Sequence, residues 1–377
     1  MTNEVKNVPE LRFPGFEDEW KEKKLGTIFT VTMGQSPNST NYTDNPNDTI
    51  LVQGNADIYK GKIWPRIYTK EITKLLERND IILSVRAPVG EIGIAQVEAC
   101  IGRGVCSIKG NKFLYYFLDL FKKQNRWSRF SQGSTFESIS GKDIRDLKFY
   151  VCNSEEQNKI GEFFNKLDRQ IELEEQKLEK LEEQKKGYMQ QIFSQKLRFK
   201  DENNNDYPEW KEQKLYEVVK YLSSKRSSNN YSENIMQGDY PVYDAIQEIS
   251  KDVNFDIKEP YISILKDGAG VGRLNLRPGK SSVIGTMGYL LPENIDINFL
   301  FYYLKTMNFN KFVIGSTIPH LYFKDYSKET IFVPKNEEEQ FKIGSFFIKL
   351  DKVIENKSDK IELLKERKKG FLQRMFV

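Results

Sequence analysis

The chain contains one segment twice, and this repeat constrains its fold more than any other feature of the sequence. The segment "NSEEQNKIGEFFNKLDRQIE" begins at Asn153, and "NEEEQFKIGSFFIKLDKVIE" begins at Asn336. Residues 153–193 and 336–376 align without a gap, and 23 of their 41 positions are identical. A long internal repeat indicates that one structural unit occurs twice.

The similarity extends beyond this segment. "DEWKEKKLGTIF" from Asp18 resembles "PEWKEQKLYEVV" from Pro208, and "GSTFESI" from Gly133 resembles "GSTIPHL" from Gly315. Residues 30–110 and 220–297 diverge from each other. The sequence therefore predicts two copies of one module with shared ends and different middles. The single histidine, His320, lies in the second copy and has no histidine counterpart in the first.

The repeated segment has the spacing of a coiled-coil helix. Its seam positions are separated by four and three residues in alternation, which places them on one stripe of a helix. Polar residues interrupt both stripes at the same two places, Glu174 and Lys185 in the first copy and Lys357 and Lys368 in the second. The predicted apolar seam residues are Ile160, Phe164, Leu167, Ile171, Leu178, Leu181, Ile343, Phe347, Leu350, Ile354, Ile361 and Leu364.

A helix over Gln157–Phe193 would be about 55 Å long, and its single apolar stripe requires a partner helix. We expect that partner to be the other copy, packed antiparallel; the alternative is that each helix covers only its own domain. The apolar helix ends, 188–193 and 371–377, are expected to be exposed, so the isolated chain is expected to be unstable. Gly187 and Gly370 are predicted weak points near these ends.

The divergent middles have the pattern of compact, mostly β domains. Short apolar runs such as "TIFTVTM", "DIILSV" and "IGIAQV" alternate with polar turn clusters in the first copy, and "EPYISILKDGAGVGRLNL" repeats this pattern in the second. A short helix is predicted after each β domain, within residues 111–127 in the first copy and 297–312 in the second. The fold class is therefore α+β.

Composition restricts the function classes. The 377 residues suffice for two or three domains, and 30% charged with 13% aromatic residues is typical of a globular protein. Three cysteines and one histidine offer little material for a metal site or for a hydrolytic triad in each copy. Sparse cysteines, the lack of an apolar leader and the lack of a membrane-length apolar run favour a cytoplasmic location.

Catalytic motifs are also weak. "GAGVG" at Gly268–Gly272 falls short of a cofactor loop and is better explained by a tight turn between strands. The chain has no adjacent proline pair, so the motif of amino-group DNA methyltransferases is missing. Strings such as "EEQK" are typical of a solvated coiled-coil face, and Cys100, Cys106 and Cys152 are expected to be buried small hydrophobic residues.

The order W-K-E-x-K-L, variable β domain, "DIILSVRAPVG", G-S-T and E-E-Q-x-K-I-G-x-F-F-x-K-L-D resembles the specificity subunits of type I restriction–modification systems. The resemblance covers nearly the whole chain. It implies two pseudo-symmetric, mostly-β target-recognition domains, joined by two long antiparallel coiled-coil helices. The implied boundaries are a first recognition domain at 1–152, a first spacer helix at 153–197, a second recognition domain at 198–335 and a second spacer helix at 336–377.

The resemblance also implies the partners. Such a subunit binds double-stranded DNA at an interrupted sequence, docks two methyltransferase subunits and recruits restriction subunits. It binds no cofactor itself and no metal, and S-adenosylmethionine is expected on the methyltransferase subunits. Adenine methylation or DNA cleavage would then be carried out by partners, and this chain would not be an enzyme.

Polar side chains of the two modules, most of them in the divergent middles, are the candidates for contacts to DNA. Arg, Lys, Asn and Gln can reach base edges, and Ser, Thr and Lys commonly hold phosphates. The first-module candidates are Gln35, Ser36, Asn38, Asn41, Arg66, Arg86, Lys122, Lys123, Arg126 and Arg129. The second-module candidates are Lys225, Arg226, Asn229, Asn230, Lys266, Arg273 and Arg277.

Two other functions are compatible with these patterns. A coiled-coil adaptor with protein-binding β modules would show no salt-dependent affinity for DNA, because it would release no counterions. A self-sufficient methyltransferase or nuclease would be active as the purified chain with S-adenosylmethionine or magnesium alone.

Overall fold

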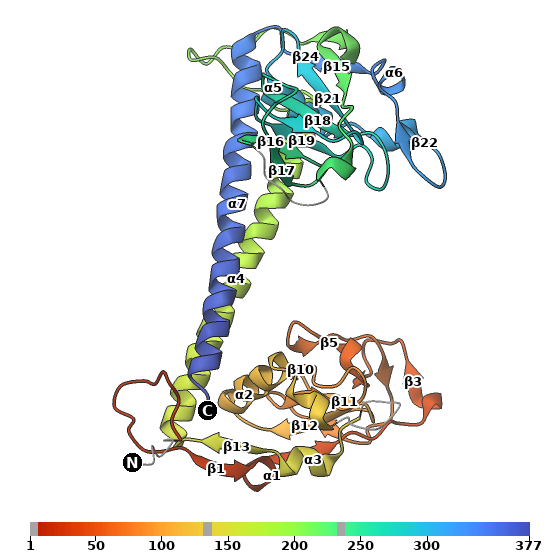
Figure 1. Cartoon of the computed structure of the whole chain (residues 1–377). Coiled ribbons are helices and arrows are strands. Elements are labelled where there is room, and N and C mark those ends of the chain that lie inside the picture. Colours follow the sequence, from red (N-terminus) through yellow and green to blue (C-terminus); the bar gives the residue numbers. More distant parts are fainter. Residues whose placement is uncertain (1–6, 131–137, 232–237) are drawn as a thin grey trace, which may run out of the picture. The chain divides into compact units, whose positions relative to one another are not determined.

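A computed structural model describes residues 7–130, 138–231 and 238–377, apart from the side chains of Ser228 and Asn230 (Figure 1). The chain divides into two compact units: residues 1–175 with 360–377, and residues 176–359. Each unit contains one strand-rich domain and a part of each long helix. The division between the units therefore falls within both long helices. The domain boundaries predicted from the sequence lie instead at the helix ends, and they stay a prediction.

The first unit is built around antiparallel sheets. Strand β1 (Lys21–Lys24) pairs with β13 (Lys148–Val151) next to the long helix. A four-stranded antiparallel sheet has the order β10 (Ile92–Ile94), β9 (Ile81–Ser84), β12 (Val105–Lys109), β2 (Thr30–Met33). A second sheet has the order β3 (Tyr42–Thr43), β7 (Tyr68–Thr69), β4 (Thr49–Val52), β11 (Ala99–Ile101), β8 (Leu75–Leu76), with β4 and β11 parallel. The hairpin β5 (Ile58–Tyr59) and β6 (Lys62–Ile63) lies beside β10.

The second unit repeats this topology in the stretch where the two sequences diverge. β14 (Lys211–Lys214) pairs with β24 (Thr330–Val333). The four-stranded antiparallel sheet has the order β19 (Leu274–Arg277), β18 (Tyr261–Leu265), β21 (Met287–Pro292), β15 (Val219–Ser223), which matches β10-β9-β12-β2 strand for strand. A smaller sheet has the order β17 (Glu248–Asp252), β16 (Tyr240–Tyr243), β20 (Ser282–Val283), and β22 (Val313–Ile314) pairs with β23 (His320–Leu321). The two divergent middles thus share one sheet topology although their sequences differ.

Short helices complete each domain. α1 (Leu25–Ile28), α2 (Lys112–Lys123) and α3 (Gly141–Asp146) lie in the first unit, and α5 (Ile297–Leu304) and α6 (Phe323–Tyr326) lie in the second. The predicted strand "TIFTVTM" is partly wrong, since Thr27 and Ile28 belong to α1 and the strand begins at Thr30. The fully buried Leu25 anchors this helical turn in the core, which explains the difference.

Two long helices run through the repeat, α4 (Ser154–Phe193) and α7 (Glu337–Arg374). In the first unit the start of α4 packs against the end of α7, so these parts run antiparallel; Phe163 and Phe371 meet edge to face at 5.2 Å. In the second unit the end of α4 packs against the start of α7, with the Phe193 and Phe347 rings stacked at 5.7 Å. All twelve predicted seam residues are buried or half-buried.

A glycine that occurs in both copies of the repeat lets each long helix lie close to a short one. A Cβ on Gly161 would lie 2.7 Å from Cβ of Lys112, at the start of α2. A Cβ on Gly344 would lie 2.7 Å from Cβ of Asn298, at the start of α5. Such distances are shorter than van der Waals contact, so the glycine of "KIG" in each copy is required for this close approach.

The two lysines that interrupt the seam take part in matching polar contacts. The Tyr116 hydroxyl donates to Asp168 Oδ2 at 2.9 Å, and Lys368 Nζ lies 2.6 Å from Asp168 Oδ1. In the second unit the Tyr302 hydroxyl donates to Asp351 Oδ2 at 2.6 Å, and Lys185 forms an ion pair with the same carboxylate. The repeated "KLD" aspartate therefore joins a short helix to the other long helix in both units.

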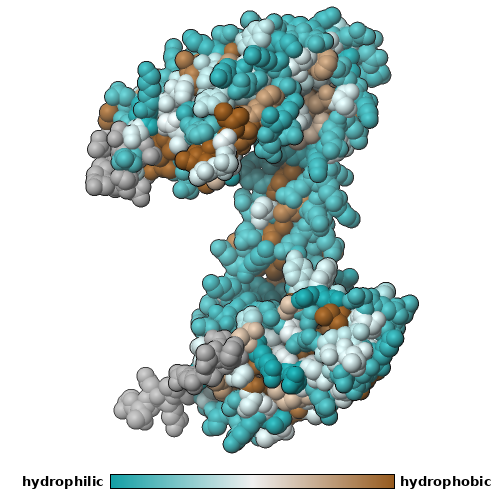
Figure 2. Space-filling model, turned by 90° about the vertical axis from the view of Figure 1, so that its right-hand side faces the viewer, coloured by the Kyte–Doolittle hydropathy of each residue, from teal (hydrophilic) through white to brown (hydrophobic). Residues whose placement is uncertain are grey.

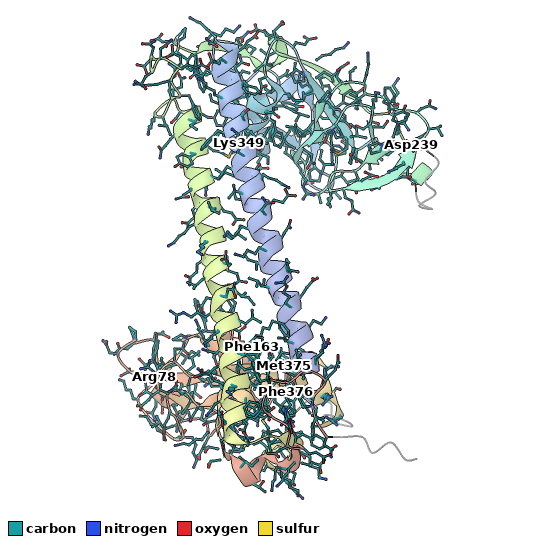
Figure 3. The ribbon with its side chains drawn as sticks, turned by 90° about the vertical axis from the view of Figure 1, so that its left-hand side faces the viewer. Arg78, Phe163, Asp239, Lys349, Met375 and Phe376 are labelled. Atoms are coloured by element: carbon teal, nitrogen blue, oxygen red, sulfur yellow. The ribbon has the colours of Figure 1, made fainter. Side chains whose placement is uncertain are left out.

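Most of each apolar helix end is buried, so the expectation that the ends are exposed is wrong for those residues, whereas Tyr188 and Val377 are each 38% exposed. Ile192 and Phe193 belong to the core of the second unit, and Met375 and Phe376 belong to the core of the first (Figure 3). Phe376 lies 5.1 Å from the Phe113 ring centroid. Each buried helix end packs within the core of its own unit, so the main premise for instability of the isolated chain is removed.

No described helix is both long and apolar enough to cross a bilayer. The face of the molecule in Figure 2 is mostly hydrophilic, with separate apolar patches. Cys100 and Cys106 are buried and Cys152 is half-buried; all three thiols are free.

Candidate nucleic-acid interface

One end of the four-stranded sheet gathers several predicted DNA contacts in the first unit. β2 and β9 end there and β12 begins there, because Met33 pairs with Cys106 and Ser84 pairs with Val105. The loop after β2 and the turn after β9 are consequently neighbours. This sheet end brings together Gln35, Ser36 and Arg86, which lie far apart in the sequence.

The loop over residues 34–41 is held in shape from within the unit. A Cβ on Gly34 would lie 2.1 Å from the Gly102 carbonyl oxygen, so only glycine fits. The Glu71 carboxylate accepts hydrogen bonds from the Asn38 backbone N–H at 2.9 Å and from the Asn41 amide at 2.7 Å. These bonds lower the pKa of Glu71. Asn38 and Asn41 are thus used to hold the loop, whereas Gln35 has an exposed side chain.

The structure adds Arg103, which sequence reasoning missed. Arg103 is exposed on the turn between β11 and β12, and its backbone N–H donates to Ser36 Oγ at 3.1 Å. Both flanking glycines are tightly packed: a Cβ on Gly104 would lie 1.9 Å from the Gln53 carbonyl oxygen. The pattern Gly-Arg-Gly between two apolar runs was the available signal, since it indicates a tight turn that presents one side chain.

Arg86 lies beside this turn. The Val85 N–H donates to the Gly104 carbonyl at 2.8 Å, so the residue after Val85 adjoins the Arg103 turn. Arg86 is exposed and forms no ion pair with any described residue. Arg66 is also exposed, and its guanidinium lies 3.7 Å from Asp57, which in turn accepts from the Gln53 N–H at 2.7 Å. Arg66 therefore borders the same sheet end.

The candidates Lys122, Lys123, Arg126 and Arg129 form a basic patch that is predicted to contact phosphates, and this patch packs on the turn after β9. A Cβ on Gly90 would lie 2.3 Å from the buried Trp127 ring, which fixes the 3-10 turn Arg126–Phe130 on this turn. Arg126 and Arg129 are exposed and lie over the Phe121 ring; partial burial and the neighbouring Arg129 lower the pKa of Arg126.

The two lysines of this patch are paired within the unit. Lys122 Nζ lies 2.5 Å from Glu91 Oε2, and Lys123 Nζ lies 2.7 Å from Asp119 Oδ2. Arg126 and Arg129 are therefore better placed for phosphate contacts than these lysines.

The equivalent sheet end of the second unit has different side chains. Lys225 follows β15 in the place of Gln35, because the Ser224 N–H donates to Met287 as Gly34 does to Val105. Lys225 is exposed and forms no ion pair with any residue described. Gly285 stands in the place of Arg103. The exposed cation of the second unit is therefore Lys225 on the loop after β15, whereas that of the first unit is Arg103 on the turn before β12.

Arg226 is engaged inside the unit. Its guanidinium donates to both oxygens of Asp256, to Asp252 and to the Tyr231 hydroxyl at 2.7 Å. These hydrogen bonds, the one to Asp256 above all, raise the pKa of Arg226. Its donors fasten the loop after β15 to the strand-rich domain, so they are not available for a base in this arrangement.

Lys266, Asp267 and His320 form a cluster after β18. Lys266 Nζ lies 2.6 Å from Asp267 Oδ2, and His320 Nδ1 lies 2.7 Å from Asp267 Oδ1. Burial opposes ionisation of Asp267, but the two hydrogen bonds outweigh it and lower the pKa of Asp267. His320 occupies the place of Ser138, since Asp267 bridges to His320 as Arg86 bridges to Ser138.

The remaining second-unit candidates are scattered. Arg273 is exposed on the turn that contains Gly268–Gly272, which links β18 and β19 as predicted. Arg277 is buried, donates to the Asp244 carbonyl at 2.8 Å and lies over the Tyr243 ring; burial lowers its pKa. Asn229 is exposed, and the side chain of Asn230 lies outside the described part of the structure.

The two sheet ends thus present exposed hydrogen-bond donors and cations on matching scaffolds. Guanidinium, amide and ammonium groups can bind base edges and phosphates. Among the described residues no group of histidine, cysteine and acidic side chains is arranged for a metal ion.

Comparison with known proteins identifies the family. The family model for the type I restriction modification DNA specificity domain matches residues 17–183 and 207–366, one stretch for each module. The putative type I restriction enzyme MjaX specificity subunit of Methanocaldococcus jannaschii is 33% identical over 208 residues, which cover 52% of this chain and 46% of that protein. The match thus spans about half the length of this relative.

Longer matches agree with it. The type I restriction enzyme MjaIX specificity subunit of the same organism is 22% identical over 400 residues, which cover 95% of this chain and 92% of that protein. The crystal structure of the type I restriction–modification S subunit from M. genitalium has the same fold, with a TM-score of 0.67 and 19% identity over 98% of this chain and 99% of that one. The chain therefore belongs to the type I restriction–modification DNA specificity family, as a specificity subunit.

Proposed function

We propose that this chain binds an interrupted, asymmetric duplex DNA target, with each module contacting one half of it. One observation carries the proposal: two sheets of the same topology end in different exposed side chains. Gln35, Arg86 and Arg103 lie at the first sheet end, and Lys225 lies at the second. Because base edges are distinguished by hydrogen-bonding side chains, different sheet ends would recognise different sequences.

The repeated parts support a second role, as spacer and docking surface. Several contacts of the long helices recur in both units, among them the glycine packing and the Tyr–Asp–Lys contacts. Repeated contacts suit partners of one kind, so two methyltransferase subunits would dock, one for each module. The helices would fix the number of unread base pairs, as dimer geometry sets half-site spacing in other DNA-binding proteins.

In this proposal the chemistry belongs to the partners. Methylation of a base requires that the base leave the helical stack and enter an active site. The docked subunits would bind S-adenosylmethionine and methylate adenine, and restriction subunits would join the same core for cleavage. This chain would determine only where on the DNA they act.

A methylation map tests the proposal. The chain is co-expressed with its cognate methyltransferase subunit in a host without adenine methylation, and N6-methyladenine is mapped across the genome. The expected result is an interrupted motif with two unlike halves. Replacing residues 20–150 with those of a relative should change one half alone; methylation without this chain, or none with it, contradicts the proposal.

Salt titration distinguishes this function from that of a protein-binding adaptor. A chain that neutralises phosphates releases counterions, so its affinity for duplex DNA should fall steeply with salt concentration. An adaptor would show neither the affinity nor the slope.

A further inference from the structure

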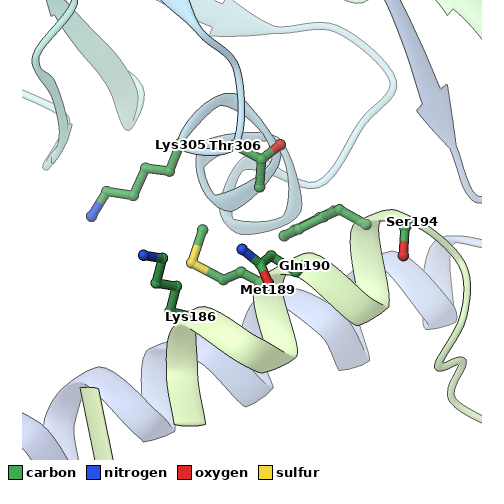
Figure 4. A pocket seen from close by; sticks show the side chains of 7 residues that line it. Lys186, Met189, Gln190, Ser194, Lys305 and Thr306 are labelled. Atoms are coloured by element: carbon green, nitrogen blue, oxygen red, sulfur yellow. The ribbon is translucent and has the colours of Figure 1, made fainter. Parts of the chain in front are cut away.

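The second unit has a pocket whose charge is not repeated in the first. An open pocket of about 480 Å³ lies between the end of α4 and the end of α5. Its lining residues are Lys186, Met189, Gln190, Phe193, Ser194, Lys305 and Thr306. Lys186 and Lys305 extend toward the same side of the pocket, with Met189 between them (Figure 4). Neither lysine forms an ion pair within the described part of the chain.

The first unit neutralises the same position. Tyr116 and Tyr302 are equivalent, since each donates to the "KLD" aspartate of a long helix. Three residues later the first unit has Asp119 and the second has Lys305. Asp119 Oδ2 lies 2.7 Å from Lys123 Nζ and 3.7 Å from Lys368 Nζ. In the first unit the Asp119 carboxylate therefore lies beside the ammonium groups of Lys123 and Lys368.

In the second unit Lys305 takes this place beside Lys185, which is itself ion-paired with Asp351. Lys185 is the repeat equivalent of Lys368, and it lies close enough to Lys305 to disfavour its charge. Partial burial comes first and Lys185 second among the causes that lower the pKa of Lys305. The Lys305 ammonium also lies over the Phe301 ring, at 4.5 Å. Two ammonium groups beside a pocket with polar and apolar walls suit an anionic group on a short stem.

We propose that this pocket binds a carboxylate side chain of a docking protein subunit, so that the second module holds its partner more tightly than the first. The inference rests on the proposed function, because the partner is the methyltransferase subunit. A protein carboxylate is favoured over a DNA phosphate because the pocket is lined by the last turns of α4 and the residues just after α4 and α5, with the apolar side chains of Met189 and Phe193 among them. An apolar wall suits the stem of an aspartate or glutamate side chain.

The test measures binding of the cognate methyltransferase subunit to the full chain. Titration calorimetry at two salt concentrations should resolve two affinities for the wild-type chain. The double variant Lys186→Glu/Lys305→Glu should weaken one site at least tenfold and leave the other within twofold. The neutral variant Lys186→Gln/Lys305→Gln should weaken the same site by a smaller factor, and thermal unfolding should show that both variants fold.

A matched control carries the same charge change elsewhere. Lys258 and Lys280 are exposed on loops of the second unit, so Lys258→Glu/Lys280→Glu should leave both affinities unchanged. The proposal is overturned if the pocket variants bind both partners as the wild type does, or if they lose affinity for DNA instead of the partner. If the wild-type chain binds no methyltransferase subunit, the docking part of the proposed function fails as well. If the wild-type chain binds the subunit and the pocket variants bind it equally well, the pocket proposal alone fails.

Discussion

Arg12 donates two hydrogen bonds to the fully buried carboxylate of Glu156, from Nε to Oε1 at 2.6 Å and from Nη2 to Oε2 at 2.8 Å. These bonds raise the pKa of Arg12, the side-chain hydrogen bond being the largest cause. Arg198 and Glu339 form the same pair in the second unit, at 2.8 Å. Each pair fastens the segment before a β domain to the first turn of the helix that follows it.

Removal of Arg12 should therefore destabilise the first unit. Arg12→Ala leaves the buried carboxylate without its partner, which typically costs about 3 kcal/mol or more. Urea unfolding followed by circular dichroism would measure the loss. Lys24→Ala breaks an exposed ion pair with Asp146, and should cost less than about 1 kcal/mol. Equal losses for the two variants would show that the buried pair has no special role.

Two glycines of the second unit should respond to alanine in opposite directions. A Cβ on Gly187 meets nothing within 4 Å, so Gly187→Ala should stabilise the helix by about 0.5–1 kcal/mol. A Cβ on Gly344 would lie 2.7 Å from Asn298, so Gly344→Ala should destabilise the unit by about 1–3 kcal/mol. Thermal unfolding of both variants tests this, and stabilisation by Gly344→Ala would contradict the tight packing.

The buried Cys106 thiol should make the chain less stable in alkali. Burial raises the pKa of Cys106 from 9.0 to about 12. The unfolded chain releases this proton near pH 9 and the folded chain does not, so the contribution to stability is complete below pH 9 and is lost between pH 9 and 12. The loss from this group is at most about 1.4 kcal/mol per pH unit.

Alkylation separates Cys106 from other alkaline effects. Iodoacetamide at pH 8 should leave Cys106 unlabelled in the native chain and label it in urea, as read by peptide mass spectrometry. Cys106→Ser should flatten the stability profile above pH 9; labelling of the native chain at the rate of a free thiol would show that the thiol is accessible.

Arg103 should determine one half of the DNA target. Loss of a guanidinium that contacts a base typically costs about 1–3 kcal/mol and relaxes specificity at that position. Arg103→Ala should therefore alter the half of the methylation motif assigned to residues 20–150 and leave the other half intact. Arg78 is an exposed arginine before the start of β9, opposite the sheet end that carries Arg86, so Arg78→Ala is the matched control (Figure 3).

Neighbouring cations of the second unit should behave differently. Lys225→Ala should weaken DNA binding and reduce its salt dependence with little effect on unfolding, because the lysine is exposed. Arg226→Ala should lower the stability of the second unit, because it removes the donors that hold Asp252 and Asp256. A DNA-binding defect without loss of stability in Arg226→Ala would reverse this assignment.

The sequence predicted the architecture because the relevant signals are periodic and local. The seam spacing indicated two long helices, and alternating apolar runs indicated strands around Ile81–Ser84 and Tyr261–Leu265. It did not predict that the divergent middles have one topology. Strand pairing depends on the pattern of buried positions along each strand. Two sequences can keep this pattern while their residues differ.

The side-chain environments could not be predicted in the same way. The burial of Arg277 and the partners of Arg226 arise from residues about thirty positions away, whose proximity exists only in the folded sheet. The Arg12–Glu156 pair could have been found, since "LRF" occurs at both Leu11 and Leu197 before each "EWKE". In the fold the Leu11 N–H bonds to Arg374 as the Leu197 N–H bonds to Gln191.

The separation of shared ends from different sheet ends has a consequence for heredity. A β domain exchanged by recombination between matching ends would keep the contacts that the shared residues make with the long helices, such as the Arg12–Glu156 pair, and would bring a different sheet end. New target sequences could then arise by recombination of existing domains, without stepwise mutation. The number of distinct targets available to a population would grow as the product of the domain variants at the two positions, and not as their sum.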